Sequence, residues 1–270
     1  QVPGVQGWQV MFFVEGMLAV LAGIAAYFFL INSPQDAKFL EKDEKKALLD
    51  VMALEDTVKE ETGPRGVLAA MKNGKVWYFT VIYFCLQVAV YGVTFYLPQQ
   101  VAQLTGQKVG LAVGLMAAIP WFFGIFACYF IGRAANTVVR RRVWGTGLFI
   151  STGLCIFGSA WAGANHIPAL GIVFISLAVC SFLSIGPIAW SYPTAFLTGT
   201  AAAAGIGLIN SLGNLGGFVA PILRTSVNQI TASDTGTMGV YALGVLPFLA
   251  AAMMFATKRF QNKADELLEQ

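Results

Sequence analysis

Seven long apolar segments constrain the fold of this 270-residue chain more than any other feature of its sequence. A helix that crosses a bilayer needs about 20 mostly apolar residues. Only 11% of the residues are charged, whereas a soluble domain has about 25%. The sequence therefore predicts an all-α fold, a polytopic membrane helix bundle. Its seven spans are expected at residues 11–31, 76–97, 109–131, 143–163, 170–189 (running on toward 196), 201–224 and 238–256.

Lysine and arginine indicate how the bundle is oriented. All but two of the 17 basic residues lie in the connection 32–75, in the loop between the third and fourth spans, or in the tail after 257. The exceptions are Lys108 and Arg224, which fall on the opposite side. The positive-inside rule places the basic side in the cytoplasm. We therefore expect a cytoplasmic C-terminus and an N-terminus on the other side.

The connection 32–75 is the only long polar stretch. Ser33 followed by Pro34 is typical of a helix cap and a first helical residue. Residues 41–61 place apolar side chains among charges at roughly helical spacing. The favoured interpretation is a solvated linker helix on the cytoplasmic face. A regulatory docking site is the alternative.

Two neighbouring spans contain residues that a lipid-facing helix avoids. The first has prolines beside Trp190 and Ser191, and the second combines amides with a run of glycines. Irregular backbone and mid-depth polar groups are tolerated where they line protein or a water-filled cavity. We interpret this pair as one wall of a solute pathway. Its predicted helix breaks are Gly186, Pro187 and Pro193, and its predicted solute-contacting residues are Trp190, Ser191, Asn210, Ser211 and Asn214.

The second span adds three candidates for solute contact. Tyr83, Gln87 and Tyr91 recur every four residues, so they share one helix face. Their hydroxyl and amide groups can donate hydrogen bonds to a carboxylate without burying a charge. The alternative is structural: the tyrosines pack inside the bundle and Gln87 bonds to a neighbouring helix. Ser191, Ser211 and Asn214 have the same alternative.

No enzyme or metal chemistry is indicated. The sequence has no Walker A glycine loop, and its only histidine, His166, lies in a loop. The four cysteines all fall inside apolar spans, at no metal-ligand spacing. Glu15 is the only acid clearly inside a span, and we expect a structural role for it. We predict no catalytic residue, metal or cofactor, and the net charge of +3 gives no sign of nucleic-acid binding.

Four stretches carry a resemblance to a known family. They are GWQVMFFVEGMLAVLAG at 7–23, SPQDAKFLEKDEKKAL at 33–48, IYFCLQVAVYGVTFYLP at 82–98 and GPIAWSYPTAFLTGTAAAAGIGLINSLGNLGGFVAP at 186–221. Together they resemble the anion:cation symporter branch of the major facilitator superfamily. The resemblance implies that the seven spans are helices six to twelve of a twelve-helix transporter. The chain is then expected to be a fragment without helices one to five.

The resemblance also implies a domain organisation and a site. Residues 1–31 would hold the last helix of the N-terminal bundle and 32–75 a cytoplasmic linker between bundles. Residues 76–257 would form the six-helix C-terminal bundle, with a cytoplasmic tail at 258–270. In sugar-acid transporters of this branch, the positions of Trp190 and Asn210 line the organic-anion site, and the middle of helix seven lines the cavity.

One loop departs from the family pattern. Such transporters usually carry Gly-x-x-x-Asp-Arg-x-Gly-Arg-Arg between helices eight and nine, where charge pairing ties the cytoplasmic helix ends. Here Asn136 replaces the acid and Thr137 the following arginine. We therefore expect the latch, meaning this charge pairing between the cytoplasmic helix ends, to be weaker. The retained positions are Gly132, Arg140, Arg141 and Arg142.

The resulting prediction is a secondary active transporter that couples uptake of a small organic anion, such as a sugar acid, to protons. Its partners would be the anion, the coupling proton, the bilayer and the missing N-terminal helices. Its location would be a bacterial inner membrane. The alternatives are a truncated remnant or helix-packing partner that transports nothing, and a channel or receptor. The solute and the coupling ion stay open.

Overall fold

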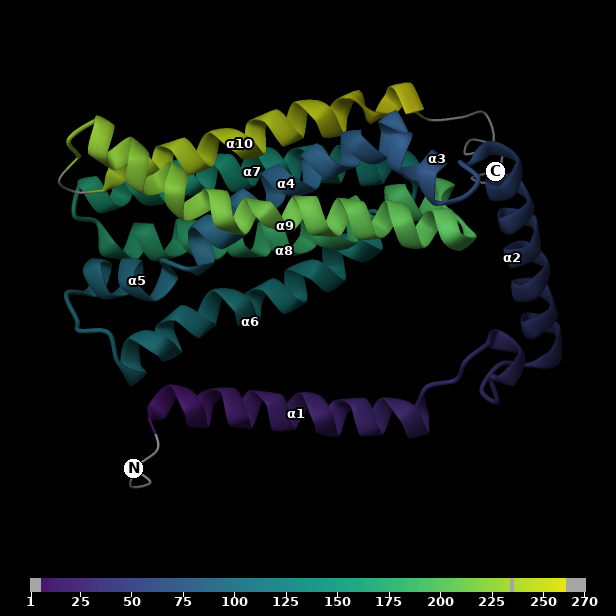
Figure 1. Cartoon of the computed structure of the whole chain (residues 1–270). Coiled ribbons are helices and arrows are strands. Elements are labelled where there is room, and N and C mark those ends of the chain that lie inside the picture. Colours follow the sequence, from purple (N-terminus) through teal and green to yellow (C-terminus); the bar gives the residue numbers. More distant parts are fainter. Residues whose placement is uncertain (1–5, 234–235, 261–270) are drawn as a thin grey trace. The chain divides into compact units, whose positions relative to one another are not determined.

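The computed structural model describes residues 6–233 and 236–260, and every regular element in these ranges is helical (Figure 1). Seven of the described helices are long and apolar enough to cross a membrane. The chain is therefore an all-α polytopic membrane helix bundle, as predicted. The helices are α1 (Gly7–Phe29), η1 (Pro34–Asp36), α2 (Lys42–Thr62), α3 (Val67–Lys72), α4 (Gly74–Thr94), α5 (Leu97–Thr105), α6 (Leu111–Ala134), α7 (Val138–Ala164), α8 (Pro168–Phe196), α9 (Gly199–Ile230), α10 (Thr237–Ala256) and η2 (Thr257–Phe260).

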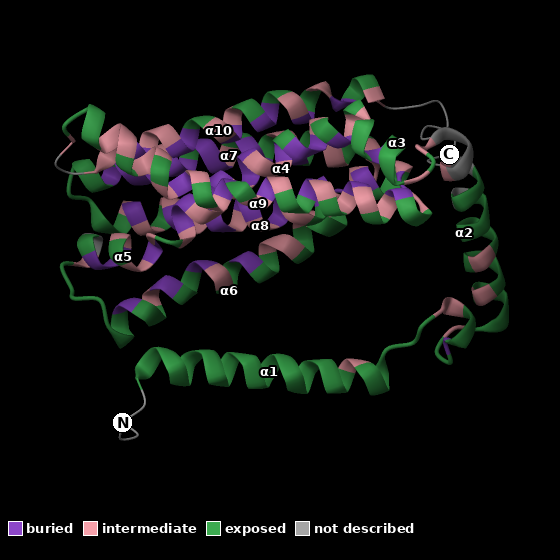
Figure 2. Ribbon diagram, in the orientation of Figure 1, coloured by how far each residue is buried: buried purple, intermediate pink, exposed green. Residues whose placement is uncertain are grey.

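The chain divides into two compact units, Gln1–Val58 and Lys59–Gln270. In the first unit, α1 has no buried residue and its ribbon is green along almost its whole length in Figure 2. The Ser33 hydroxyl accepts a hydrogen bond from the Gln35 N–H at 3.2 Å, so it caps η1 as predicted. The unit boundary falls inside α2, so the domain limits at 31/32 and 75/76 stay predictions.

The second unit is built around the helices α4, α7, α8 and α10. Figure 2 shows the buried residues gathered where these helices meet. Among its largest fully buried side chains are Phe149, Phe182, Ile185, Leu243 and Met254. On the outside of this core, α9 packs along α4 and α10, and α6 packs along α8.

Glycine lets α7 and α10 approach closely. The Phe248 ring of α10 lies against Gly153 of α7, and the Phe157 ring of α7 lies against Gly244 of α10. A β-carbon at either glycine would lie within 3.0 Å of the facing ring. Small residues allow membrane helices to gain van der Waals contact that lipid cannot supply. This reciprocal packing holds α7 and α10 together in the second unit.

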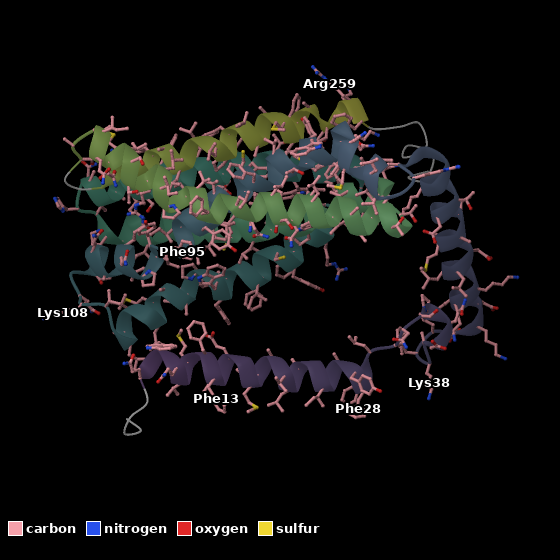
Figure 3. All side chains as sticks on the ribbon, in the orientation of Figure 1. Phe13, Phe28, Lys38, Phe95, Lys108 and Arg259 are labelled. Atoms are coloured by element: carbon pink, nitrogen blue, oxygen red, sulfur yellow. The ribbon has the colours of Figure 1, made fainter. Side chains whose placement is uncertain are left out.

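The second unit has two chemically different ends. The basic end carries α3, the α6–α7 loop, the α8–α9 turn and η2; the α5 end carries α5, the α7–α8 loop and the α9–α10 connection. Figure 3 labels Arg259 at the basic end and Lys108 at the α5 end. The short helix α5 is a difference from the sequence prediction, in which the apolar span runs on to Leu97. It ends at Gly106, whose left-handed φ of 67° stops the helix.

Candidate functional site

A chain of amides joins the middles of α4 and α9. Gln87 Nε2 donates a hydrogen bond to Asn214 Oδ1 at 2.6 Å. Asn214 Nδ2 in turn donates to the backbone oxygen of Asn210 at 2.8 Å and to its Oδ1 at 2.9 Å. The two helices are thus linked by neutral groups whose polar atoms are largely satisfied. We call Tyr83, Gln87, Trp190, Asn210 and Asn214 the polar cluster.

Glycines of α9 set the distance between α4 and α9. Tyr83 lies against Gly213 and Tyr91 lies against Gly217. A β-carbon at Gly216 would lie 2.7 Å from the Phe84 backbone oxygen and 2.8 Å from the Val88 nitrogen, both on α4. Tyr83, Gln87 and Tyr91 therefore point to one partner helix, as their spacing predicts. These contacts are also those of the structural alternative, in which each side chain packs within the bundle.

Trp190 brings α8 into the same cluster. Its ring meets the Tyr83 ring edge-on, with centroids 5.0 Å apart. Toward the basic end, Phe79 of α4 stacks on Tyr192 of α8 at 5.4 Å. Both Trp190 and Tyr83 are half-buried. Aromatic contacts thus hold α8 against α4 beside the amide chain, and the polar cluster spans three helices.

One edge of the polar cluster is open. Asn210 and Ser211 are exposed, although they lie near the middle of α9. Asn210 accepts both hydrogen bonds from Asn214 Nδ2. The side-chain nitrogen of Asn210, Nδ2, donates to none of the described residues. The edge therefore offers neutral donors and acceptors to a small polar molecule, without a charge of its own.

The predicted breaks in the proline-containing helix are not interruptions. Helix α8 runs continuously from Pro168 to Phe196 through Pro187 and Pro193, and Gly186 lies within it. Proline at 187 cannot donate to the Leu183 carbonyl one turn earlier, and the Cys128 thiol of α6 lies 3.9 Å from that oxygen instead. The freed carbonyl thus has a neighbour from another helix. The gating role of these three residues stays a prediction.

The loop between α6 and α7 is held by arginines. Arg140 Nη1 donates to Asn136 Oδ1 at 3.2 Å, and Arg141 Nε donates to the Ala135 backbone oxygen at 3.3 Å. The Thr137 hydroxyl caps α7 by accepting from the Arg140 N–H. Asn136 therefore still receives an arginine, as a neutral acceptor. A hydrogen bond to a neutral acceptor is weaker than one to a carboxylate, in line with the expected weaker latch. Gly132 and Arg142 flank these contacts.

Comparison with known proteins decides the family. The family model described as the Major Facilitator Superfamily matches residues 4–221, well over half of the chain. The chain belongs to the major facilitator superfamily. The predicted membership of this superfamily is thereby confirmed.

The curated relatives compared with this major facilitator superfamily chain are longer than it is. It is 37% identical over 255 residues to the inner membrane transport protein RhmT of Escherichia coli (strain K12), covering 94% of this chain and 57% of the relative. It is 33% identical over 265 residues to a putative tartrate transporter of Agrobacterium vitis, covering 97% and 57%. A quinolone resistance transporter of Acinetobacter baumannii is 29% identical over 247 residues, covering 91% and 55%. The chain thus spans about 57% of the length of the first two.

The structure brings together five of the eight predicted solute-contacting residues of this superfamily member, those of the polar cluster. Tyr91 lies farther along α4, where its ring is 5.3 Å from that of Phe95. Ser191 bonds within its own helix, donating to the Ile188 oxygen at 2.7 Å. Ser211 is exposed beside Asn210. Whether any of them contacts solute stays a prediction.

Sequence reasoning missed one residue of chemical interest. Arg224 counted only as one of the two basic residues on the side opposite the others. It is half-buried in α9, near the α5 end. A charge inside an otherwise apolar span is a functional candidate by default, and that signal was present in the sequence.

Proposed function

We propose that this superfamily member is a secondary active transporter of a small organic anion, driven by protons, and that the polar cluster lines its solute path. The observation that carries the proposal is the open edge of the polar cluster, near the middle of a long apolar helix. An amide moved from water into hydrocarbon without partners costs several kcal/mol, about 4–8 by transfer to cyclohexane. Asn210 therefore favours a water-filled path over a position against lipid.

The chemistry of the polar cluster suits a carboxylate. Amide, indole and phenol groups donate hydrogen bonds to anionic oxygens while remaining neutral themselves. Two relatives from Agrobacterium vitis are named putative tartrate transporters, and tartrate is a small dicarboxylate with hydroxyl groups. These names support an organic anion as the substrate class.

Proton coupling through a carboxylate needs a group outside the membrane-spanning helices of the second unit. The sequence of α4 and of α6 to α10 contains no aspartate or glutamate, so these helices offer no carboxylate to carry the proton. We therefore assign coupling to a partner bundle, for which the greater length of the relatives leaves room. Helix α1, none of whose side chains is buried, would be the part of this chain that belongs to that bundle.

The proposed orientation follows from charge. The basic end of the second unit would face the cytoplasm and the α5 end the opposite side. The membrane would be a bacterial inner membrane, in keeping with the name of the Escherichia coli relative. Solute would then pass between the two ends as the bundles rock against each other around the midplane.

Uptake of labelled tartrate tests the proposal. The complete gene product is reconstituted in proteoliposomes, and an inward proton gradient is imposed. We expect accumulation that an uncoupler abolishes. Asn210→Ala and Trp190→Ala should each reduce uptake by about tenfold or more, a loss of about 1.4 kcal/mol or more. Leu215→Ala is the matched control, because Leu215 is an exposed apolar residue on the same helix.

Three results would contradict parts of the proposal. Uptake that survives both substitutions would make the polar cluster a packing element. Accumulation without a proton gradient would remove proton coupling. A carboxylate panel with no accumulation at all would remove the organic anion. Uptake by the complete product, with none by residues 1–270, would assign transport to the two bundles together.

A further inference from the structure

A polar cavity lies at the α5 end of the second unit, separate from the polar cluster. Its volume is about 570 Å³. The residue that stands out in its lining is Arg224, which lies about 15 Å farther along α9 than Asn214, at the rise per residue of an α-helix. The other polar side chains of the lining come from α5, α7, α10 and the α7–α8 loop: Gln100, Gln103, Thr105, Ser159, His166 and Thr237.

The guanidinium of Arg224 is held on an aromatic face. Its Cζ lies 3.8 Å from the centroid of the Tyr96 ring, close enough for a cation–π interaction. Yet Arg224 Nη1 is buried and has no hydrogen-bond partner among the described residues. A buried donor left without an acceptor costs about 1–3 kcal/mol, and more when it is charged. Stacking thus fixes the position of the guanidinium and leaves part of its donor capacity unused.

Glycine in α10 keeps the arginine in place. A β-carbon at Gly239 would lie 2.8 Å from Arg224 Cγ, so only glycine leaves room for the stem of the side chain. The Gly239 N–H donates to Asn228 Oδ1 at 2.7 Å, which ties α10 to the next turn of α9. Contacts from α9, α10 and the start of α5 thus hold the arginine side chain in place.

The charge balance of the cavity favours an anion. None of its described lining residues is acidic, and Arg224 is the only charged residue in α9. On α5, Gln100 follows Tyr96 by one turn, with its N–H bonded to the Tyr96 oxygen at 2.8 Å. It therefore brings a neutral donor to the side on which the guanidinium is stacked.

We propose that this cavity is an anion-binding site, separate from the polar cluster, that takes the carboxylate of a small organic anion. The planar guanidinium matches the two oxygens of a carboxylate in a bidentate pair. Gln100 and Ser159, both in the lining, supply neutral hydrogen bonds to the rest of the molecule. The site lies at the mouth of the bundle, where it would hold an anion before or after passage. Binding here does not depend on transport through the polar cluster.

Equilibrium binding to the full chain in phosphatidylcholine nanodiscs tests this site. The probes are radiolabelled tartrate, succinate and acetate. We expect saturable binding of at least one carboxylate, weakened about tenfold or more by Arg224→Gln. Arg224→Lys keeps the positive charge but loses the planar N–H donors that form the bidentate pair. It should therefore weaken binding less than Arg224→Gln does. Gln100→Leu should weaken binding severalfold without disturbing the half-buried arginine. Lys108→Gln is the matched control, because it removes an exposed cation from the same end.

A comparison of the two sites separates this proposal from the previous one. Asn210→Ala, which alters the polar cluster, should leave the Arg224-dependent binding in place. If Asn210→Ala removes all binding and Arg224→Gln removes none, the anion binds only in the polar cluster and this proposal is wrong, while the proposed function stands. Absence of saturable binding by all three probes would also overturn it.

The remaining alternative is a lipid headgroup. Replacing a quarter of the phosphatidylcholine by phosphatidylglycerol should not displace the bound carboxylate. Loss of the Arg224-dependent carboxylate binding on this replacement would assign the arginine to lipid phosphate and overturn the proposal. Thermal midpoints of all variants within about 2 °C of the parent would show that loss of binding is local, since 1 kcal/mol shifts the midpoint of a domain of this size by about 2–4 °C.

Discussion

Gly216 is the point of closest backbone approach that we describe between α4 and α9. The atoms that face it are the Phe84 oxygen and the Val88 nitrogen, which belong to the backbone and cannot swing aside as a side chain can. Every added atom must therefore move a helix. Overpacking of this kind costs about 1–3 kcal/mol.

Gly216→Ala should lower the thermal midpoint of the chain by several degrees, because the two helices must separate to admit one methyl group. The measurement is thermal unfolding in detergent, followed by circular dichroism. Gly207→Ala is the matched control, since nothing lies within 4 Å of a β-carbon at Gly207 on the same helix. Equal midpoints for the two variants would mean that α9 does not pack on α4 as described.

Asn214 and Gln87 should behave as a pair. Asn214→Leu removes the acceptor of the 2.6 Å hydrogen bond and leaves the Gln87 amide half-buried without it, at a cost of about 1–3 kcal/mol. Gln87→Leu has the converse effect. The double substitution should destabilise by less than the sum of the two, by at least about 0.5 kcal/mol. Additive losses of stability would show that the two amides do not interact.

At the scale of the element, α8 shows a helix that tolerates proline without ending. Pro187 deprives the Leu183 oxygen of its helical donor, and α6 approaches there with Cys128 and with Gly124, which lies against the Leu183 side chain. Neighbouring helices make such positions tolerable in membranes. The hydrogen bond that α8 loses at the Leu183 oxygen is thus partly offset by contacts from α6.

Pro187→Ala tests whether this position has a gating role in the proposed transporter. Alanine restores a backbone donor, so the thermal midpoint should not fall. If bending at 187 is needed for transport, the maximal uptake rate should drop severalfold while the KM changes little. Pro34→Ala is the control, because Pro34 opens η1, where no helical donor is lost. An unchanged uptake rate would make Pro187 a packing residue.

At the scale of the whole molecule, the two ends of the second unit should lie on opposite sides of the membrane. Lys108 and Arg259 are both exposed and mark these ends (Figure 3). Lys108→Cys should react with a membrane-impermeant maleimide in intact cells. Arg259→Cys should react at least about tenfold more after permeabilisation. The unsubstituted chain is the control for its native thiols, two of which are buried and two half-buried. The reverse labelling pattern would invert the proposed topology.

The spans were predictable because hydropathy is a local property, and each predicted span lies within a few residues of its helix apart from the longer α8 and α9. The direction in which Gln87 points was also predictable from spacing. Its partner was not, because Asn214 is 127 residues away and only packing selects it. The end of α4 was mistaken because α5 depends on burial of Leu97 and Val101, which sequence alone does not report. Arg224 was recognisable in the sequence as a charge in an apolar span, but its contacts with Tyr96 and Gly239 were not predictable, because these residues come from other elements.

The close seating of α4 on the glycines of α9 has a mechanical consequence. Tyr83, Tyr91 and the α4 backbone fill the space over Gly213, Gly216 and Gly217, so neither helix can slide or roll on the other without collision. The pair should therefore travel as one rigid body during any alternation between inward-open and outward-open states. Spin labels placed on α4 and α9 should therefore keep a constant separation. A transporter of this kind would change shape by moving these two helices together as one block.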